Sequence, residues 1–255
     1  MTVWLNGALR SAGEARIDPA DRGFLLGDGL FETMAAHAGA VPELARHYVR
    51  LCAGAALLRI PVPLTREELA VAIHDLLAAK GLVDAALRLT LTRGPGPRGL
   101  LPPSGPNPTL LLTAAPLPPP GGPLRLVTSR IRRDEDSPLS AIKSLNYLPG
   151  VLARIEAAER EADDALLLNR AGRVAETSIA NLFVRLHGEW ITPPVSEGAL
   201  PGIRRACLLD AGKLREAAIT VEELRQAEAV CAGNALSLRP IASIDGYSLP
   251  SLNTP

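Results

Sequence analysis

The chain has 255 residues, 47% apolar and 21% charged, which is typical of a globular protein with one large domain or two small ones. Its formal net charge is zero and its pI is near 6.9, so we expect no binding to nucleic acid or to a membrane. No apolar run reaches the ~18 residues of a membrane span, and the first residues lack a signal-peptide pattern. Three scattered cysteines, Cys52, Cys207 and Cys231, predict reduced thiols and a cytoplasmic location. The four histidines lack the spacing of metal ligands, so we expect no metal site.

The first half of the chain alternates strand and helix patterns. Thr65 and Glu68 form a capping box that predicts the start of a helix, and the alternating run 86–92 is typical of a half-buried strand. In chain order we predict a strand at 3–5 closed by Asn6-Gly7, a tight glycine-rich loop at 22–29 leading into a strand that ends at His37, helices at 43–58 and 65–80, and strands at 86–92 and 109–114 flanking a Gly/Pro-rich loop at 94–108.

A proline-rich run at 116–123 separates the two halves and is the clearest linker of the chain. We therefore predict a first domain over 1–115 and a second over 124–255. The elements expected in the second are strands at 124–128, 165–168 and 181–186, helices at about 149–162, 202–211 and 221–228, and final strands from 229. These patterns indicate an α+β fold with two lobes and with the chemistry weighted to the second lobe.

Lys143 is the most informative single residue, because only three of the 27 basic residues are lysines. Lys80 precedes a helix-ending glycine and Lys213 lies in a charged stretch, whereas Lys143 is flanked by apolar residues. An amine held among apolar groups has a depressed pKa and can act as a nucleophile or base. A lysine whose stem lies along a core edge, with its head in water, fits the same pattern, and the residue alone does not separate the two interpretations.

Five short segments occur in order along the chain, and together they are a specific signal although each alone is weak. They are His47–Leu51, Ser140–Leu152, Gly172–Phe183, Leu200–Arg205 and Gly233–Pro240. In this order they resemble the fold-type IV pyridoxal phosphate enzymes, the class IV aminotransferase family. The resemblance implies a fold similar to D-amino acid transaminase, with a smaller N-terminal α/β lobe and a larger β-rich C-terminal lobe that binds pyridoxal 5'-phosphate. It also implies a homodimer with the active site near the interface and a small amino compound as substrate.

The resemblance also implies a role for each candidate residue. Lys143 would form the Schiff base with the cofactor and later carry the substrate proton, and Glu176 would keep the pyridine nitrogen protonated. Arg50 would bind the cofactor phosphate through two donors. Without the resemblance, Arg50 would be interpreted as a solvated helix arginine and Glu176 as an acid at a strand end. The other implied cofactor contacts are the backbone of Ile203 and Arg204 at a helix N-terminus, Asn234 near the phosphate, and Tyr147 at the phenolic oxygen.

The substrate-binding positions separate the members of the family. D-amino acid transaminases hold the substrate carboxylate with Tyr, Arg and His, where this chain has Phe31, Arg98 and Leu100. Two lost charge-assisted hydrogen bonds, worth about 1.5–3 kcal/mol each, make that activity a poor fit. Branched-chain transaminases bind the substrate carboxylate partly at the last segment, where the resemblance implies a contact with the backbone N–H of Ala235. The loop Arg93–Gly99, however, is similar to the R-G-x-G-x-R-G loop of 4-amino-4-deoxychorismate lyases.

The resemblance therefore implies first a lyase that releases pyruvate from 4-amino-4-deoxychorismate to give 4-aminobenzoate, a reaction of folate biosynthesis. The alternative is a transaminase acting on D-amino acids, branched-chain amino acids or amines. A third hypothesis, a non-catalytic relative that serves as a binding module, is disfavoured because Lys143 and Glu176 are both present.

Overall fold

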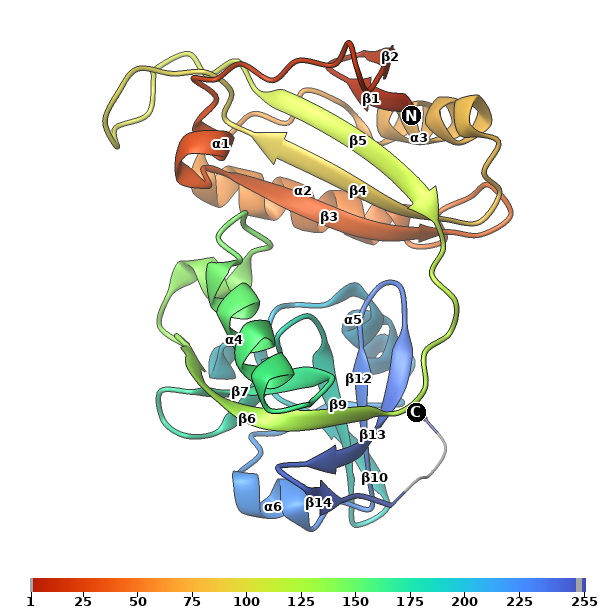
Figure 1. The fold of residues 1–255 in the computed structure, drawn as a ribbon, viewed down its shortest axis with the longest axis vertical. Helices are drawn as coiled ribbons and strands as arrows, with labels where there is room; N and C mark the ends of the chain where they lie inside the picture. Colours follow the sequence, from red (N-terminus) through yellow and green to blue (C-terminus); the bar gives the residue numbers. More distant parts are fainter. Residues whose placement is uncertain (1, 251–253) are drawn as a thin grey trace. The chain divides into compact units, whose positions relative to one another are not determined.

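The computed structural model describes residues 2–250 and 254–255 and confirms a mixed α+β fold (Figure 1). The chain forms two compact units. The first runs to Pro118 and also contains Ile142–Asn146, and the second contains Pro119–Ala141 and the chain from Tyr147 onward. Although Lys143 follows the proline-rich run in sequence, its segment thus packs with the first unit.

The first unit is an antiparallel sheet covered by helices. Its strands are β1 (Thr2–Leu5), β2 (Ala8–Ser11), β3 (Gly29–Ala36), β4 (Ala85–Thr92) and β5 (Thr109–Pro116), in the order β2-β1-β5-β4-β3. Helix α2 (Leu44–Leu58) packs on β3, and α3 (Arg66–Lys80) packs on β1 and β5 (Figure 1). Strand β3 is therefore an edge of the sheet, a position that leaves backbone groups available for another segment.

Local sequence signals account for most of this unit. The capping box at Thr65 and Glu68 forms as expected at the start of α3. In β4, Leu87, Leu89 and Leu91 alternate into the core and are at most 1% exposed. The glycine-rich segment differs from the expected loop, because it contains a short helix, α1 (Arg22–Leu26), whose N-terminus is capped by the side chain of Asp21.

The second unit is built on a nine-stranded sheet. Eight strands follow the order β11-β10-β9-β12-β13-β6-β7-β8, and β14 pairs with β13. The strands are β6 (Leu124–Arg133), β7 (Asp164–Asn169), β8 (Val174–Thr177), β9 (Asn181–Leu186), β10 (Glu189–Thr192), β11 (Arg215–Glu216), β12 (Ala229–Gly233), β13 (Leu238–Ile244) and β14 (Tyr247–Ser248). Its helices are α4 (Leu148–Glu159), α5 (Ile203–Asp210) and α6 (Val221–Arg225), with 3-10 turns at Pro138–Ala141 and Val195–Glu197. Helix α4 packs on β6 and β7 (Figure 1).

Strand β6 is longer than the sequence predicts. We expected it to end at Thr128, but it continues to Arg133. Its pairing with β7 shifts register between Thr128 and Arg132, and the Ser129 hydroxyl donates to Glu156 at 2.6 Å within this irregularity. After the register shift the pairing resumes at Arg132 and Arg133, and Arg133 is part of the candidate site. In the described part of the chain, no helix is both long and apolar enough to cross a membrane.

Candidate active site

The backbone of the Lys143 segment is bound to the edge strand β3. The N–H of Phe31 donates to the carbonyl of Lys143 at 2.9 Å, and the N–H of Leu145 donates to the carbonyl of Gly29, also at 2.9 Å. A Cβ atom on Gly29 would lie 2.4 Å from the carbonyl oxygen of Leu91 and 2.8 Å from a methyl group of Leu145. Glycine at position 29 therefore lets the segment lie directly against the sheet, which fixes the backbone of Lys143.

The side chain of Lys143 lies over an aromatic ring. Its Nζ atom is 4.1 Å from the ring centroid of Phe31, a side chain that is 5% exposed. The guanidinium of Arg88 lies 3.9 Å from the same centroid. Cation–π attraction orients the lysine head over the face of this ring. Lys143 therefore lies against an apolar ring of the first unit, and Phe31 supplies that ring.

Arg50 belongs to a buried ionic cluster on α2 and β3. Its Nε and Nη2 atoms donate to the two carboxylate oxygens of Glu32 at 2.8 and 2.6 Å, and Nδ1 of His47 lies 2.7 Å from the same carboxylate. Burial raises the pKa of Glu32, but the hydrogen bonds with Arg50 and His47 lower it by more, so its pKa lies below the ordinary value. Glu32 therefore holds the guanidinium of Arg50 in a fixed position.

The two arginines of the Arg93–Gly99 loop have different environments. Arg93 is buried, and its guanidinium pairs with Asp28 at 2.7 Å and donates to the carbonyl groups of Leu58 and Arg59. Arg98 and Leu100, in contrast, are exposed. Arg93 thus has a structural role, and Arg98 is the loop arginine available to a ligand.

Glu176 lies on β8 in the second unit and is 8% exposed. One carboxylate oxygen pairs with Nε of Arg133 at 3.0 Å, and the other accepts the N–H of Leu200 at 3.0 Å. Arg133 also donates to the carbonyl groups of Gly198 and Ser140 at 2.9 and 3.1 Å. The buried carboxylate is therefore anchored by a charge and by a backbone donor, so that its orientation is set before any ligand binds.

The N-terminus of α5 follows directly after Leu200. Gly202 is its N-cap, and no side chain among the described residues caps it. The first turn of a helix leaves N–H groups without intrahelical acceptors, and here they belong to Ile203 and Arg204. A Cβ atom on Gly202 would lie 1.9 Å from Oδ1 of Asn181, whose Nδ2 donates to the carbonyl of Leu200 at 2.8 Å. The turn before α5 is therefore closely packed against Asn181, and its backbone N–H groups can bind an anion.

Arg204 and Asn234 lie together beside this helix. Nε of Arg204 donates to the backbone carbonyl of Asn234 at 2.7 Å, and burial lowers the pKa of Arg204. The Oδ1 atom of Asn234 accepts the N–H groups of Leu236 and Ser237 at 2.9 and 3.0 Å. The Asn234 side chain therefore stabilises the turn that contains Ala235, as asparagine commonly does by accepting backbone N–H groups a few residues ahead.

Tyr147 is the N-cap residue of α4 and is half-buried. A Cβ atom on Gly150 would lie 3.2 Å from the carbonyl of Ser178 and 3.9 Å from the ring of Tyr147. Gly150 thus lets the start of α4 approach the chain that follows Glu176. In the second unit the structure brings together Glu176, the start of α5, Arg204 and Asn234 through hydrogen bonds, and in the first unit it brings together Phe31 and Lys143.

Sequence reasoning missed three charged residues that position these groups. Arg133 lies in a run of charged residues that is typical of solvated surface, so nothing local marks it. Glu32, in contrast, interrupts an apolar strand pattern, and Asp28 lies between two glycines within an apolar stretch. Both are unfavourable positions for an unpaired carboxylate. That pattern could have indicated buried arginine partners for both.

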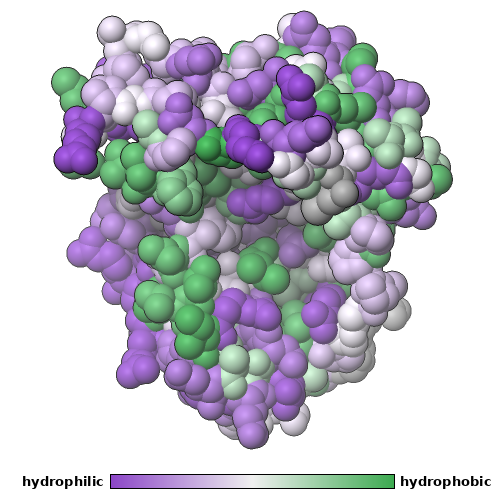
Figure 2. Space-filling view, turned by 45° about the horizontal axis from the view of Figure 1, so that its top comes forward, coloured by the Kyte–Doolittle hydropathy of each residue, from purple (hydrophilic) through white to green (hydrophobic). Residues whose placement is uncertain are grey.

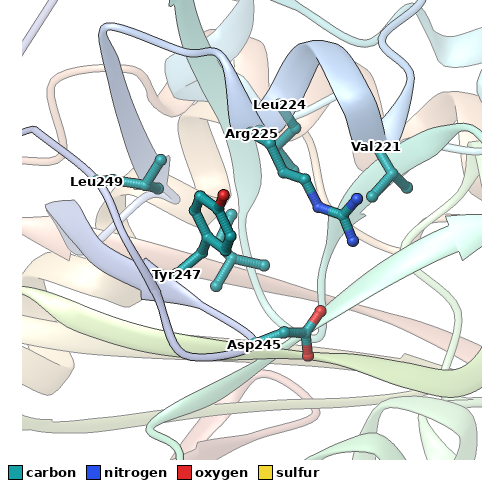
Figure 3. A pocket seen from close by; sticks show the side chains of 7 residues that line it. Val221, Leu224, Arg225, Asp245, Tyr247 and Leu249 are labelled. Atoms are coloured by element: carbon teal, nitrogen blue, oxygen red, sulfur yellow. The ribbon is translucent and has the colours of Figure 1, made fainter.

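A small pocket of the second unit contains none of the predicted site residues. Figure 3 shows it between α6 and the β13–β14 hairpin, lined by Val221, Leu224, Arg225, Ile244, Asp245, Tyr247 and Leu249. Its carboxylate is already used, because Asp245 accepts the hydroxyl of Thr128 at 2.6 Å and pairs with Arg160 at 3.2 Å. Within the described residues, no three His, Cys, Asp or Glu side chains are grouped so as to hold a metal ion.

Comparison with known proteins identifies the family. The model of the family described as amino-transferase class IV matches residues 29–244. The chain belongs to the class IV aminotransferases. It is 37% identical to a Methanocaldococcus jannaschii protein provisionally named branched-chain-amino-acid aminotransferase, over 96% of this chain and 88% of that protein. It is 31% identical to the D-alanine aminotransferase of Bacillus licheniformis, over 98% and 91% of the two chains. It also resembles the crystal structure of 4-amino-4-deoxychorismate lyase from Pseudomonas aeruginosa, with a TM-score of 0.86, 33% identity and coverage of 98% and 94%.

The chain is therefore an enzyme of the fold-type IV class, and its cofactor is pyridoxal 5'-phosphate. The chemistry of the residues fits this group. Lys143 provides an oriented amine, Glu176 a buried and anchored carboxylate, and the start of α5 provides backbone donors suited to a phosphate. These three features match the aldehyde, the ring nitrogen and the phosphate of the cofactor in chemical type.

Proposed function

We propose that this class IV enzyme is a lyase that converts 4-amino-4-deoxychorismate to 4-aminobenzoate and pyruvate. The observation that carries the proposal is the ring of Phe31 beside the amine of Lys143, at the position where the resemblance gives D-amino acid transaminases a tyrosine. An apolar ring there suits a cyclic substrate better than the carboxylate of a small amino acid. The similarity to the Pseudomonas aeruginosa lyase and the exposed Arg98 of the matching loop also support it.

The bound cofactor supplies a ring that withdraws electrons from the carbon bearing the substrate amine. In the proposed reaction the amine of Lys143 would take the proton from that carbon. Glu176 keeps the pyridine nitrogen protonated, and Arg98 binds a substrate carboxylate. The C–O bond to the enolpyruvyl group would then break as the ring becomes aromatic, and the proton held by Lys143 would return to the leaving enolpyruvate to give pyruvate. The atoms balance without a second substrate.

The proposed phosphate contacts are Arg50, the backbone of Ile203 and Arg204, and the turn formed by Asn234. Tyr147 would donate to the phenolic oxygen, and the N–H of Ala235 would contact the substrate. Support comes from the fixed guanidinium of Arg50 and from the uncapped start of α5 among the described residues. Each contact would use a donor that the fold already orients, which lowers the entropy cost of binding.

A transaminase is the second candidate, because the Methanocaldococcus jannaschii relative is 37% identical and is provisionally named as an aminotransferase. A transaminase needs a keto acid to complete its second half-reaction, whereas the lyase turns over with a single substrate. This difference allows a direct test.

The test is to incubate the purified holoenzyme with 4-amino-4-deoxychorismate in the absence of any keto acid. Pyruvate is followed with lactate dehydrogenase and 4-aminobenzoate by chromatography. The lyase predicts equal amounts of both products over many turnovers. Absence of release, together with amino-group transfer from D-alanine or L-leucine to 2-oxoglutarate, would instead establish the transaminase.

We also propose that the enzyme is a homodimer. Exposed apolar side chains occur in each unit. On α4, Leu148, Val151, Leu152 and Ile155 are each at least 49% exposed and share one helix face, and on α1 Phe24 is 77% exposed. Apolar side chains also gather at the surface shown in Figure 2. Light scattering after gel filtration should give twice the monomer mass of 26.9 kDa, and the monomer mass would contradict the proposal.

A further inference from the structure

The loop at 94–108 is tied to the segment that contains α1. The N–H of Arg22 donates to the carbonyl of Gly94 at 2.9 Å, and the N–H of Gly96 donates to the carbonyl of Ala20 at 3.2 Å. At the base of the loop, a Cβ atom on Gly94 would lie 1.7 Å from the carbonyl oxygen of Asn107. The two ends of the loop therefore touch, and its start is paired with the residues before and within α1.

The side chain of Arg22 extends from this pairing to the far part of the loop. It is 3% exposed, and its Nη1 and Nη2 atoms donate to the carbonyl groups of Gly99 and Leu100 at 2.9 and 2.8 Å. A Cβ atom on Gly96 would lie 2.8 Å from Cδ of Arg22, so glycine at this position leaves room for the arginine stem. The guanidinium fork thus binds the two consecutive carbonyl groups that follow Arg98.

Asp28 compensates the buried charge of Arg22. Its carboxylate accepts Nε of Arg22 at 2.8 Å and Nε of Arg93 at 2.7 Å. Burial raises the pKa of Asp28, but the hydrogen bonds with Arg93 and Arg22 lower it by more, so the carboxyl stays ionised near neutral pH. Arg93 in turn donates to Leu58 at the end of α2 at 2.7 Å. The loop is thereby connected through two buried arginines to α1 and α2.

We infer that Arg22 is a positioning residue for substrate recognition: it fixes the backbone directly after Arg98, so that the exposed guanidinium of Arg98 is presented to a substrate carboxylate. This inference rests on the role of Arg98 in the proposed function. It explains why a fully buried arginine donates to an otherwise exposed loop. Lysine could pair with Asp28 but has no planar fork for two carbonyl groups.

The test compares Arg22→Met with Arg10→Met, which changes an exposed arginine of β2 in the same unit. Native protein is treated with trypsin, and cleavage of the Arg98–Gly99 bond is followed by mass spectrometry. We expect this bond to be cut about tenfold faster in Arg22→Met, which corresponds to about 1.4 kcal/mol, with no change in the control. The KM for 4-amino-4-deoxychorismate should rise about tenfold while kcat stays within about twofold.

Arg22→Lys keeps the test valid if Arg22→Met does not fold, because it retains the charge that Asp28 requires. It should bind the cofactor normally and still show faster cleavage after Arg98. Cleavage no faster than in the wild type would overturn the role of Arg22, whatever the enzyme's reaction. Faster cleavage with an unchanged KM would show that Arg98 does not bind the substrate. That result would overturn the inference, because the inference depends on this role of Arg98.

Discussion

Replacing Glu176 with glutamine tests the proposed electrostatic role of this carboxylate with little change in shape. The amide oxygen of Glu176→Gln can still accept the N–H of Leu200, now 3.0 Å from the carboxylate. The charge opposite Arg133 is lost, although Arg133 keeps its bonds to the carbonyl groups of Gly198 and Ser140. The substitution therefore removes mainly the negative charge.

The size of the effect follows from the lost charge-assisted hydrogen bond. Such bonds contribute about 1.5–3 kcal/mol, so kcat should fall about 10- to 150-fold if the carboxylate holds a proton on the pyridine nitrogen. The free energy of unfolding should fall by about 1–3 kcal/mol, since Arg133 is 23% exposed and retains other acceptors.

The matched control is Glu197→Gln. Glu197 is buried in the same unit, 7% exposed, and also pairs with an arginine, Arg173, at 2.6 Å. Glu197→Gln should cost similar stability but leave kcat and the absorbance of the bound cofactor unchanged. Pyruvate release at saturating cofactor measures kcat for both variants. A Glu176→Gln variant with kcat within about twofold of the control would refute the proposed role of Glu176.

Three further predictions concern the cofactor turn, a buried cluster and a thiol. Gly202→Ala should weaken binding of pyridoxal 5'-phosphate at least about tenfold, since its Cβ would lie 1.9 Å from Oδ1 of Asn181; fluorescence titration measures this. Glu32→Gln should lower the free energy of unfolding by about 3–5 kcal/mol at pH 7, because the buried negative charge that pairs with Arg50 is lost. The pKa of Glu32 is lowered in the folded state, so urea titrations should show this difference shrinking as pH falls below the ordinary value of 4.5. Burial raises the pKa of Cys231 to about 11, so iodoacetamide at pH 8 should label it only after unfolding.

Features set by neighbouring residues could be predicted from the sequence. The capping box of α3 and the hairpin at Asn6-Gly7 depend on residues within one turn, and both formed as expected. The same holds for the helix that starts after Gly202. In these cases the structure is stabilised by hydrogen bonds between residues that are close in the sequence, so a short sequence pattern is enough to predict it.

Features set by distant residues could not be predicted in the same way. The pairing of the Lys143 segment with Gly29 and Phe31 joins segments more than a hundred residues apart in the sequence. Arg22 reaches Leu100, and nothing around position 22 marks an arginine that will be buried. The family resemblance identified which residues to consider, but only the structure showed that Glu32 and Arg133 hold them in place.

The most direct test of the account is the identity of the lysine that holds the cofactor. Borohydride reduction of the holoenzyme adds hydride to the carbon–nitrogen double bond and fixes the phosphopyridoxyl group on that side chain. The chain has only Lys80, Lys143 and Lys213, so peptide mass spectrometry gives an unambiguous assignment. We predict one label per chain, on the peptide that contains Lys143. A label on Lys80 or Lys213, or an unmodified Lys143 in protein that has bound the cofactor, would contradict the account.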